Sequence, residues 1–440
     1  MKMKKLFYIK TFGCQMNEYE SLRICKLLEE DGYAAASTYA DASVIILNTC
    51  TVRQKAEDKI YSELGRIKKY KKADADILIG VGGCLAQQEG VKLLKKFPYV
   101  DFIFGTKALP RVLQLIHNAR KGDRIADIAM ETTCQLYSEH PYKPQPGQIS
   151  AFVTIMQGCD NFCSYCIVPH VRGREWSRPA DEIVKEVQSL VKESVCEVTL
   201  LGQNVNSYGN KAIPKTTFTE LLQQLDTIKG LERIRFTTSH PKDLSPELIR
   251  AFGCIPKLCE HIHLPMQSGS NRILQHMNRQ YTRQTYLEQI SHLRTVAPHI
   301  SITSDIIVGY PGETDAEFEE TASLIDEIKF DDLFIFHYTD RKGTKASEMP
   351  DTIPYAVKID RLKILNERQR SISLEKNSAC VGKSYEVLFE EHSKKGDGCI
   401  AGRTRSCKVV NCMGPESMIG KKGMVLIDKA HIHSLTGKLI

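Results

Sequence analysis

The sequence lacks a long hydrophobic segment. No run approaches the roughly 20 consecutive apolar residues that a membrane-spanning helix needs. The basic N-terminus resembles the start of a signal peptide, but its apolar run, residues 6–9, is four residues long and favours a strand. We therefore expect a protein without a membrane anchor that works in the cytoplasm.

A fully paired set of disulfides is also excluded, because the cysteine count of 15 is odd. So many thiols exceed what an enzyme needs if cysteine serves only as a small apolar side chain. Thiolate–metal chemistry in a reducing compartment fits them better. The length of 440 residues exceeds what one core usually supports, so the sequence indicates two or three domains.

Positive charge is concentrated at the two ends of the chain. The net charge is +8 over residues 1–125, −5 over 126–376 and +4 over 377–440. Two basic ends around an acidic middle suggest a polyanionic partner, and ordinary surface charge is the alternative.

Three cysteines lie close together in the stretch 157–166, where Cys159, Cys163 and Cys166 form the pattern CxxxCxxC. They are too few to complete a tetrahedral zinc site by themselves. A cubane iron–sulfur cluster usually takes four cysteines, so a cluster on this loop would keep one iron free to bind a small molecule. The sequence therefore predicts an iron–sulfur site with one reactive corner.

The N-terminal segment, residues 1–125, alternates short β-rich runs with helical patterns and predicts an open parallel α/β sheet. Cys14, Cys50 and Cys84 each come just after one of its predicted strands. The carboxyl ends of parallel strands lie on one edge of the sheet, so these thiols should converge. The sequence therefore predicts a second metal site, and chance packing of three thiols is the alternative.

Residues 126–149 read as a linker, since the part from 131 onwards carries three prolines and little periodicity. The segment 150–376 then repeats a strand–helix pattern six times, which predicts an incomplete, open (β/α)6 barrel. The CxxxCxxC loop follows its first strand. The predicted strands are 152–155, 197–201, 233–237, 261–264, 301–308 and 332–337.

The last segment, residues 377–440, shows short strands at 385–389, 408–410 and 424–427, separated by glycine turns. This pattern predicts a small all-β barrel of a kind often used for RNA. Arg403, Arg405 and Lys408 in this segment are expected to contact an RNA backbone.

CxxxCxxC with the aromatic Tyr165 before its last cysteine, following the first strand of a partial barrel, resembles the radical S-adenosylmethionine superfamily. The layout of the whole chain, with a C-terminal barrel resembling a TRAM domain, is similar to that of the methylthiotransferases. The stretches 10–21 and 172–179 resemble the branch that modifies tRNA. Placing a methylthio group on adenine C2 breaks an unactivated C–H bond, which acid–base side chains cannot do.

The resemblance implies two 4Fe-4S clusters, one on each cysteine triad, and two equivalents of S-adenosylmethionine per turnover. It implies conversion of N6-isopentenyladenosine beside the tRNA anticodon to its 2-methylthio form, by a monomer that takes electrons from a donor such as flavodoxin or ferredoxin. The alternatives are a sister enzyme acting on threonylcarbamoyladenosine in tRNA or on a ribosomal aspartate, and a non-catalytic RNA-binding iron–sulfur protein.

Four further residues are candidates for cofactor contact: Tyr165, Gln203, Ser239 and Val308. Gln203 and Ser239, like their neighbours Asn204 and His240, follow the second and third barrel strands, where loop capping is the alternative. Val308 lies in the stretch 304–313, which resembles the family's cofactor-contacting strand, although Gly-Tyr-Pro-Gly alone is a turn.

Other polar residues have competing interpretations. Arg172, Arg174 and Arg178 are expected to bind cofactor carboxylate or tRNA phosphate, with ion pairing to barrel acids as the alternative. His261 and His263 share one face of a strand and could hold a metal, but a packed or hydrogen-bonded role is favoured. The remaining cysteines without convergent spacing are expected to be structural thiols: Cys254, Cys259, Cys399, Cys407 and Cys412.

Overall fold

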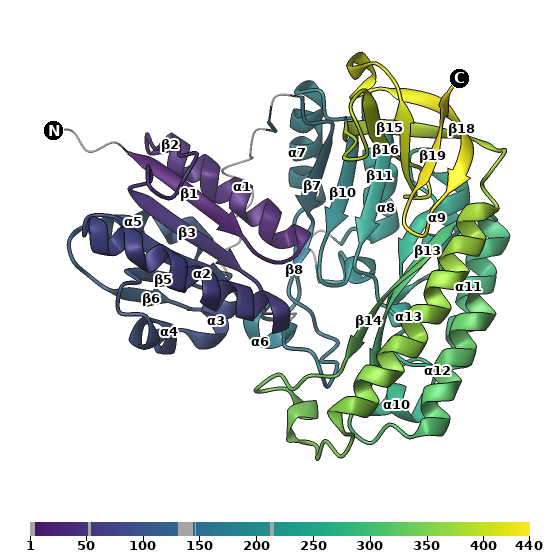
Figure 1. Ribbon diagram of the computed structural model, residues 1–440, viewed down its shortest axis with the longest axis horizontal. Coiled ribbons are helices and arrows are strands. Elements are labelled where there is room, and N and C mark those ends of the chain that lie inside the picture. Colours follow the sequence, from purple (N-terminus) through teal and green to yellow (C-terminus); the bar gives the residue numbers. More distant parts are fainter. Residues whose placement is uncertain (1–4, 52–53, 131–143, 146, 212–214) are drawn as a thin grey trace. The chain divides into compact units, whose positions relative to one another are not determined.

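The computed structural model describes residues 5–51, 54–130, 144–145, 147–211 and 215–440, apart from the side chains of 54–56 (Figure 1). Most of the predicted linker, residues 131–143 and 146, lies outside the described residues. The chain forms two compact units. The first contains residues 1–143, 157–160 and 167–178, and the second contains 144–156, 161–166 and 179–440. No described helix is long and apolar enough to cross a membrane.

The first unit is built on a six-stranded, wholly parallel sheet with the order β2-β1-β3-β4-β5-β6. All residues of β3 and β4 are buried, as expected for parallel strands with helices on both faces. The predicted open parallel sheet is confirmed, and β6 extends it past residue 125. The strands are β1 (Leu6–Thr11), β2 (Ala34–Ala35), β3 (Val44–Thr49), β4 (Leu78–Gly83), β5 (Phe102–Phe104) and β6 (Ile125–Asp127).

Helices α1 to α5 lie around this sheet, and α6 and β9 are the last elements of the unit. Ile45 and Ile79 of the strands pack with Ile60 and Leu64 of the second helix in one apolar core. The elements are α1 (Gln15–Glu30), α2 (Gln54–Ala73), α3 (Cys84–Glu89), α4 (Val91–Lys96), α5 (Val112–Arg120), η1 (Leu109–Arg111), α6 (Val168–Arg172) and β9 (Trp176–Ser177).

The second unit contains the predicted partial barrel. Two parallel half-sheets, β11-β10-β7 and β12-β13-β14, are joined where Ile234 pairs with Leu258, just before β12. No described residue pairs β7 with β14, so the barrel stays open there. The strands are β7 (Ser150–Thr154), β10 (Glu197–Leu201), β11 (Arg233–Thr237), β12 (His261–His263), β13 (Ser301–Val308) and β14 (Asp332–His337). The short strand β8 (Met156–Gln157) follows β7 and lies outside both half-sheets.

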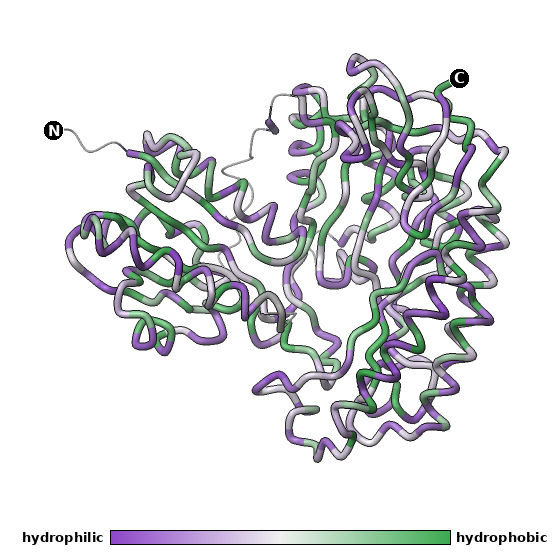
Figure 2. The backbone as a smooth tube through the Cα atoms, viewed as in Figure 1, coloured by the Kyte–Doolittle hydropathy of each residue, from purple (hydrophilic) through white to green (hydrophobic). Residues whose placement is uncertain are grey.

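Five helices of the described part of this barrel, α8 to α12, begin at serine or threonine caps. Thr217 and Thr314 each form a capping box with the glutamate three residues later, which satisfies the first free backbone amides. In Figure 2 the strands carry mostly hydrophobic colour, while the covering helices alternate in colour. The helices are α7 (Ala180–Lys192), α8 (Phe218–Asp226), α9 (Pro246–Cys254), α10 (Asn271–His276), α11 (Arg283–Val296), α12 (Asp315–Ile328) and α13 (Tyr355–Ser378), with short turns η3 (Val205–Ser207), η4 (Pro241–Asp243) and η5 (Lys345–Glu348).

The chain ends in a closed barrel of five strands around a core that includes Val387, Phe389 and Val425. The predicted small all-β barrel is confirmed, although the sequence indicated three of its strands. They are β15 (Ser384–His392), β16 (Cys399–Thr404), β17 (Val409–Met413), β18 (Lys422–Ala430) and β19 (Leu435–Leu439), with η6 (Glu416–Met418) between β17 and β18.

This closed barrel is fastened to the amino ends of the strands of the partial barrel. Arg235 donates from Nη1 to the Arg405 carbonyl and from Nη2 to the Thr404 carbonyl, each at 2.8 Å. The Arg405 guanidinium lies 2.8 Å from Glu260, and Lys408 Nζ lies 3.2 Å from Asp331.

Those contacts involve three residues that the sequence expected to contact RNA. Arg403, Arg405 and Lys408 form ion pairs within the second unit, Arg403 with Glu390 of the closed barrel. The partners of Arg405 and Lys408 are distant in sequence, which hid these pairs, and contact with RNA stays a prediction.

Candidate functional site

The first cysteine triad lies at neighbouring strand ends of the first unit. β1, β3 and β4 are adjacent in the sheet, and Cys50 and Cys84 directly follow β3 and β4. Cys14 is the N-cap residue of α1, which follows β1. Gly13 has φ of 135°, and a Cβ there would lie 2.3 Å from the Cys50 Cβ. Only glycine allows this approach, which brings the backbone next to Cys14 against Cys50.

Asparagine amides lock these strand ends to the start of α1. Asn17 Nδ2 donates to Asn48 Oδ1 at 3.2 Å and to the Thr49 carbonyl at 3.1 Å. Asn48 Nδ2 returns a bond to the Asn17 carbonyl at 2.9 Å. Thr49 Oγ1 donates to the Gly82 carbonyl across to β4. The buried bonds hold the three loops in a fixed arrangement.

A buried arginine sits beside this triad. Arg172, the last residue of α6, donates from Nη1 to Glu20 Oε1 at 2.6 Å, and its positive charge acts on Cys14 and Cys84. A hydrogen bond from Cys50 lowers the pKa of Cys14 to about 6, while burial raises the pKa of Cys84 to about 11. A guanidinium next to thiols favours the thiolate form, which is the form that binds iron.

The three arginines after the cysteine loop have different surroundings. Arg172 is paired with Glu20 on α1, an acid that no sequence spacing indicated. Arg174 lies 2.8 Å from Asp160 with an exposed side chain, and Arg178 is buried. Arg172 and Arg174 therefore form ion pairs, with acids of α1 and the cysteine loop rather than of the barrel, and their binding of cofactor carboxylate or tRNA phosphate stays a prediction.

Within the second unit, the CxxxCxxC loop places Cys163 beside a buried cation. Arg279 Nη1 donates to Cys163 Sγ at 3.4 Å and to the Tyr165 hydroxyl at the same distance. Its Nη2 is held by the Pro265 carbonyl at 2.8 Å, and the residue is 4% exposed. The sequence gave no signal for Arg279, because it lies in a loop more than a hundred residues from its partners.

His240 also faces Cys163, with Nε2 at 4.0 Å from Sγ. Burial lowers the pKa of His240 to about 2, so the imidazole is neutral at ordinary pH. His240, predicted at the carboxyl face, thus lies within the second unit next to a cysteine of the motif.

The loop is also tied to the end of β13. Ser164 Oγ lies 2.8 Å from the Tyr310 hydroxyl, and Ser164 N donates to the Met277 carbonyl at 3.0 Å. Tyr165 and Ile307 both pack against the buried cluster that includes Tyr310. The predicted stretch 304–313 therefore lies beside the cysteine loop, as expected of a shared site.

The other predicted cofactor contacts lie at the carboxyl ends of strands. Gln203 follows β10, Ser239 follows β11 and is buried, and Val308 ends β13 with a fully buried side chain. Their contact with a cofactor stays a prediction, as do the ligand roles of the six cysteines. Among the described residues, no three Cys, His, Asp or Glu side chains are already grouped to hold a metal ion.

His261 and His263 have the hydrogen-bonded role that the sequence favoured. His263 Nδ1 lies 3.0 Å and His261 Nε2 lies 3.3 Å from Thr303 Oγ1. Of the expected structural thiols, Cys259 and Cys412 are buried, and Cys399 Sγ lies 3.3 Å from Met413 Sδ.

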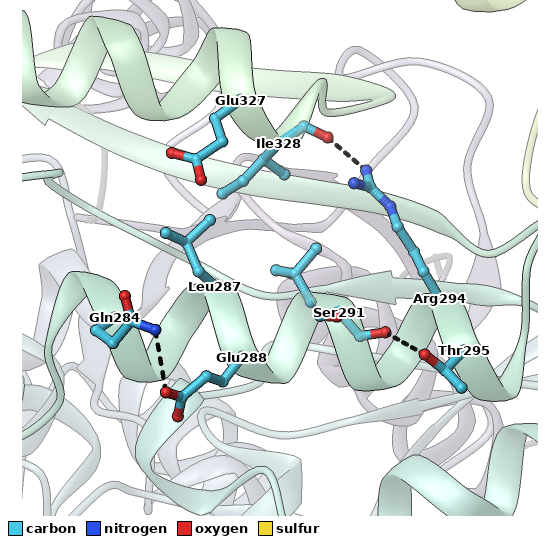
Figure 3. Close-up of a pocket in the computed structure, with 9 residues that line it drawn as sticks. Gln284, Leu287, Glu288, Ser291, Arg294, Thr295, Glu327 and Ile328 are labelled. Carbon is cyan, nitrogen blue, oxygen red and sulfur yellow. Dashed lines mark hydrogen bonds between the residues drawn. The ribbon is translucent and has the colours of Figure 1, made fainter.

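A hollow of about 650 Å³ lies on the outer side of the second unit, between α11 and the end of α12 (Figure 3). Arg294 reaches across it to the Ile328 carbonyl, and Gln284 bonds to Glu288 along α11. None of the predicted site residues lines it.

Comparison with known proteins gives three family matches along the chain. Residues 6–105 match the uncharacterized protein family UPF0004, residues 153–325 match the radical SAM superfamily, and residues 378–440 match the TRAM domain. The tRNA-2-methylthio-N(6)-dimethylallyladenosine synthase of Syntrophus aciditrophicus is 50% identical over 99% of this chain and 95% of its own length. The synthase of the same name from Geobacter metallireducens is 48% identical over 100% of this chain and 99% of its own.

Solved structures resemble this fold at low identity. The radical S-adenosylmethionine methyltransferase TsrM from Kitasatospora setae, with cobalamin and a [4Fe-4S] cluster bound, matches with a TM-score of 0.60 and 11% identity over 91% of this chain and 81% of its own. The cobalamin-dependent radical enzyme OxsB matches with a TM-score of 0.55 and 12% identity over 83% of this chain and 56% of its own. These likenesses concern the fold alone.

Proposed function

The chain belongs to the family of the tRNA-2-methylthio-N(6)-dimethylallyladenosine synthases, and we propose that it performs their reaction with its two cysteine triads. It is a radical S-adenosylmethionine methylthiotransferase that converts N6-dimethylallyladenosine beside the tRNA anticodon to the 2-methylthio form. The observation that carries this function is identity near one half over the full chain, including the segments of both triads.

The donor sets suit the cofactors of this family. Each triad offers three thiol side chains, which are the usual ligands of a 4Fe-4S cluster and leave one iron open. When bound, the two clusters and two equivalents of S-adenosylmethionine supply the radical that removes the C2 hydrogen and the sulfur that replaces it. We assign Cys159, Cys163 and Cys166 to one cluster. The other, sulfur-supplying cluster belongs to Cys14, Cys50 and Cys84.

Cationic side chains tune both triads. The buried positive charge of Arg172 lowers the pKa of both Cys14 and Cys84, although burial outweighs it at Cys84. Arg279 donates to Cys163 Sγ, and a hydrogen bond to a ligand sulfur adjusts the potential of an iron–sulfur centre. The Ser164–Tyr310 bond fixes the loop between these ligands.

The test is nucleoside mass spectrometry of tRNA from a strain lacking this gene. Accumulation of N6-dimethylallyladenosine and loss of its 2-methylthio form are expected, and restoration by the intact gene but not by Cys159→Ala or Cys50→Ala. Unchanged tRNA would refute the function. After anaerobic reconstitution, each variant should keep about half of the iron and sulfide. A Cys50→Ala variant with both clusters and full activity would refute the two-site assignment.

The same proposal covers the electron donor, the oligomeric state and the compartment. A low-potential donor such as flavodoxin or ferredoxin supplies electrons, the enzyme acts as a monomer, and it works in the cytoplasm. Thiolate ligands in two triads support a reducing compartment, because thiols stay reduced there. Sedimentation of the reconstituted enzyme and its reduction by each purified donor test these points.

A further inference from the structure

The two faces of β13 differ in character. Ile302, Ser304 and Ile306 are fully buried, whereas Thr303 and Asp305 are partly exposed. Side chains alternate along a strand, so these two sets point to opposite faces. Figure 1 shows helices α11, α12 and α13 on one side of β13 and β14. The buried set faces these helices, and the partly exposed set faces the barrel interior.

Four neighbouring side chains of this interior face form what we call the inner wall: His263, Thr303, Asp305 and Phe334. Asp305 and Phe334 are cross-strand partners of β13 and β14. The His263 and Phe334 rings meet edge to face at 6.0 Å, and His263 Nε2 lies 3.5 Å from Asp305 Oδ2. The wall thus joins an aromatic ring, a carboxylate and an imidazole in direct contact.

Phe334 is the unusual member, because its side chain is 43% exposed within a barrel whose other strand residues are mostly covered. An exposed aromatic ring among polar groups is typical of a place where a ligand ring stacks. The barrel is open next to β14, which lets a bulky molecule reach this ring.

The wall continues to the cysteine loop. Ile307 is the next residue after Asp305 on the same face of β13, and it packs, like Tyr165, against the buried cluster that includes Tyr310. Two residues of a strand span about 7 Å. A purine on the wall therefore lies two residues along β13 from the packing cluster that Tyr165, next to Cys166 in the loop, also contacts.

We propose that the inner wall binds the substrate adenine and its N6 substituent: the base stacks on Phe334, and the Asp305 carboxylate accepts a hydrogen bond from N6–H. This rests on the proposed function, because the base is extruded from its RNA stack and must be held by new contacts. The inner face of β12–β14 carries Asp305 and Asp332 and no lysine or arginine. Like charges in contact disfavour binding. The wall therefore selects a neutral N6 substituent, such as dimethylallyl, against one that carries a carboxylate.

The test compares the reconstituted full-length enzyme with Phe334→Ala, Asp305→Asn and the control Leu374→Ala, which removes an equally exposed side chain (42%) from α13. Phe334→Ala should raise the KM for dimethylallyl-tRNA by about tenfold or more. Its iron content and its cleavage of S-adenosylmethionine without tRNA should stay at wild-type values. Asp305→Asn should narrow the preference for dimethylallyl- over threonylcarbamoyl-tRNA by about tenfold. The control should match the wild type.

The proposal fails if Phe334→Ala leaves the KM for dimethylallyl-tRNA unchanged. It also fails if Phe334→Ala loses iron and tRNA-independent cleavage of S-adenosylmethionine as strongly as it loses activity on tRNA. A measurement of tRNA binding distinguishes this outcome from failure of the proposed function. If the wild type leaves tRNA unmodified, the function fails. The wall then stands only if the wild type binds dimethylallyl-tRNA more tightly than unmodified tRNA and Phe334→Ala abolishes that difference.

Discussion

The Arg235 guanidinium is one of the buried contacts that join the partial barrel to the C-terminal barrel. Its side chain is 6% exposed, donates to two carbonyls at 2.8 Å, and lies 3.0 Å from Glu197, which is equally buried. Arg235→Met keeps the length of the side chain but removes these contacts. Breaking a buried pair from one side costs about 3–5 kcal/mol, because the remaining charge stays buried.

The assay is hydrogen–deuterium exchange of the backbone amides in β15 and β16. Since each 1.4 kcal/mol is a factor of ten, opening of these strands should become at least about 100-fold more frequent. Arg250→Met is the matched control, because its ion pair with Glu247 is 61% exposed on both sides and is worth under about 1 kcal/mol. An Arg235→Met protein with exchange within threefold of the control would refute this account of the interface.

Two other substitutions test the site and the barrel. In Gly13→Ala a Cβ would strike Cys50, so the variant should lose about half of the iron and all methylthiolation while it still cleaves S-adenosylmethionine. Gly65→Ala has open space around it and should match the wild type in the same iron assay. Although burial opposes it, the Arg272 guanidinium lowers the pKa of Glu317 to about 2. The ionised form therefore stabilises the fold above the ordinary glutamate pKa near 4.3, and this contribution is lost as pH falls towards 2. Glu317→Gln should lower the melting temperature at pH 7 and have progressively less effect in acid.

The fold could be predicted wherever the signal was local. The apolar runs of β1, β3 and β4 predicted the parallel sheet of the first unit, and the cysteines after them marked the carboxyl ends of its strands. Strands such as β5 and β16 were missed because β5 has three residues and β16 contains Gly402 and Arg403, so neither shows a strong period.

The partners of charged side chains could not be predicted, because they depend on contacts across the fold. Arg172 meets Glu20 from 152 positions away, and Arg279 meets Cys163 from 116 positions away. Arg405 likewise bonds to Glu260, 145 positions away, where the sequence indicated RNA. Charge alone reports that a partner exists, and only the fold identifies it.

The first unit is discontinuous in sequence, so no single continuous fragment of the gene encodes it alone. Its sheet ends near residue 127, yet residues 167–178 belong to it, where Val171 accepts a bond from Thr106 and packs against Cys84. A fragment that stops before this segment would keep Glu20 as a buried carboxylate without its cation. Chimeras that exchange this unit between relatives should therefore carry both segments from one parent.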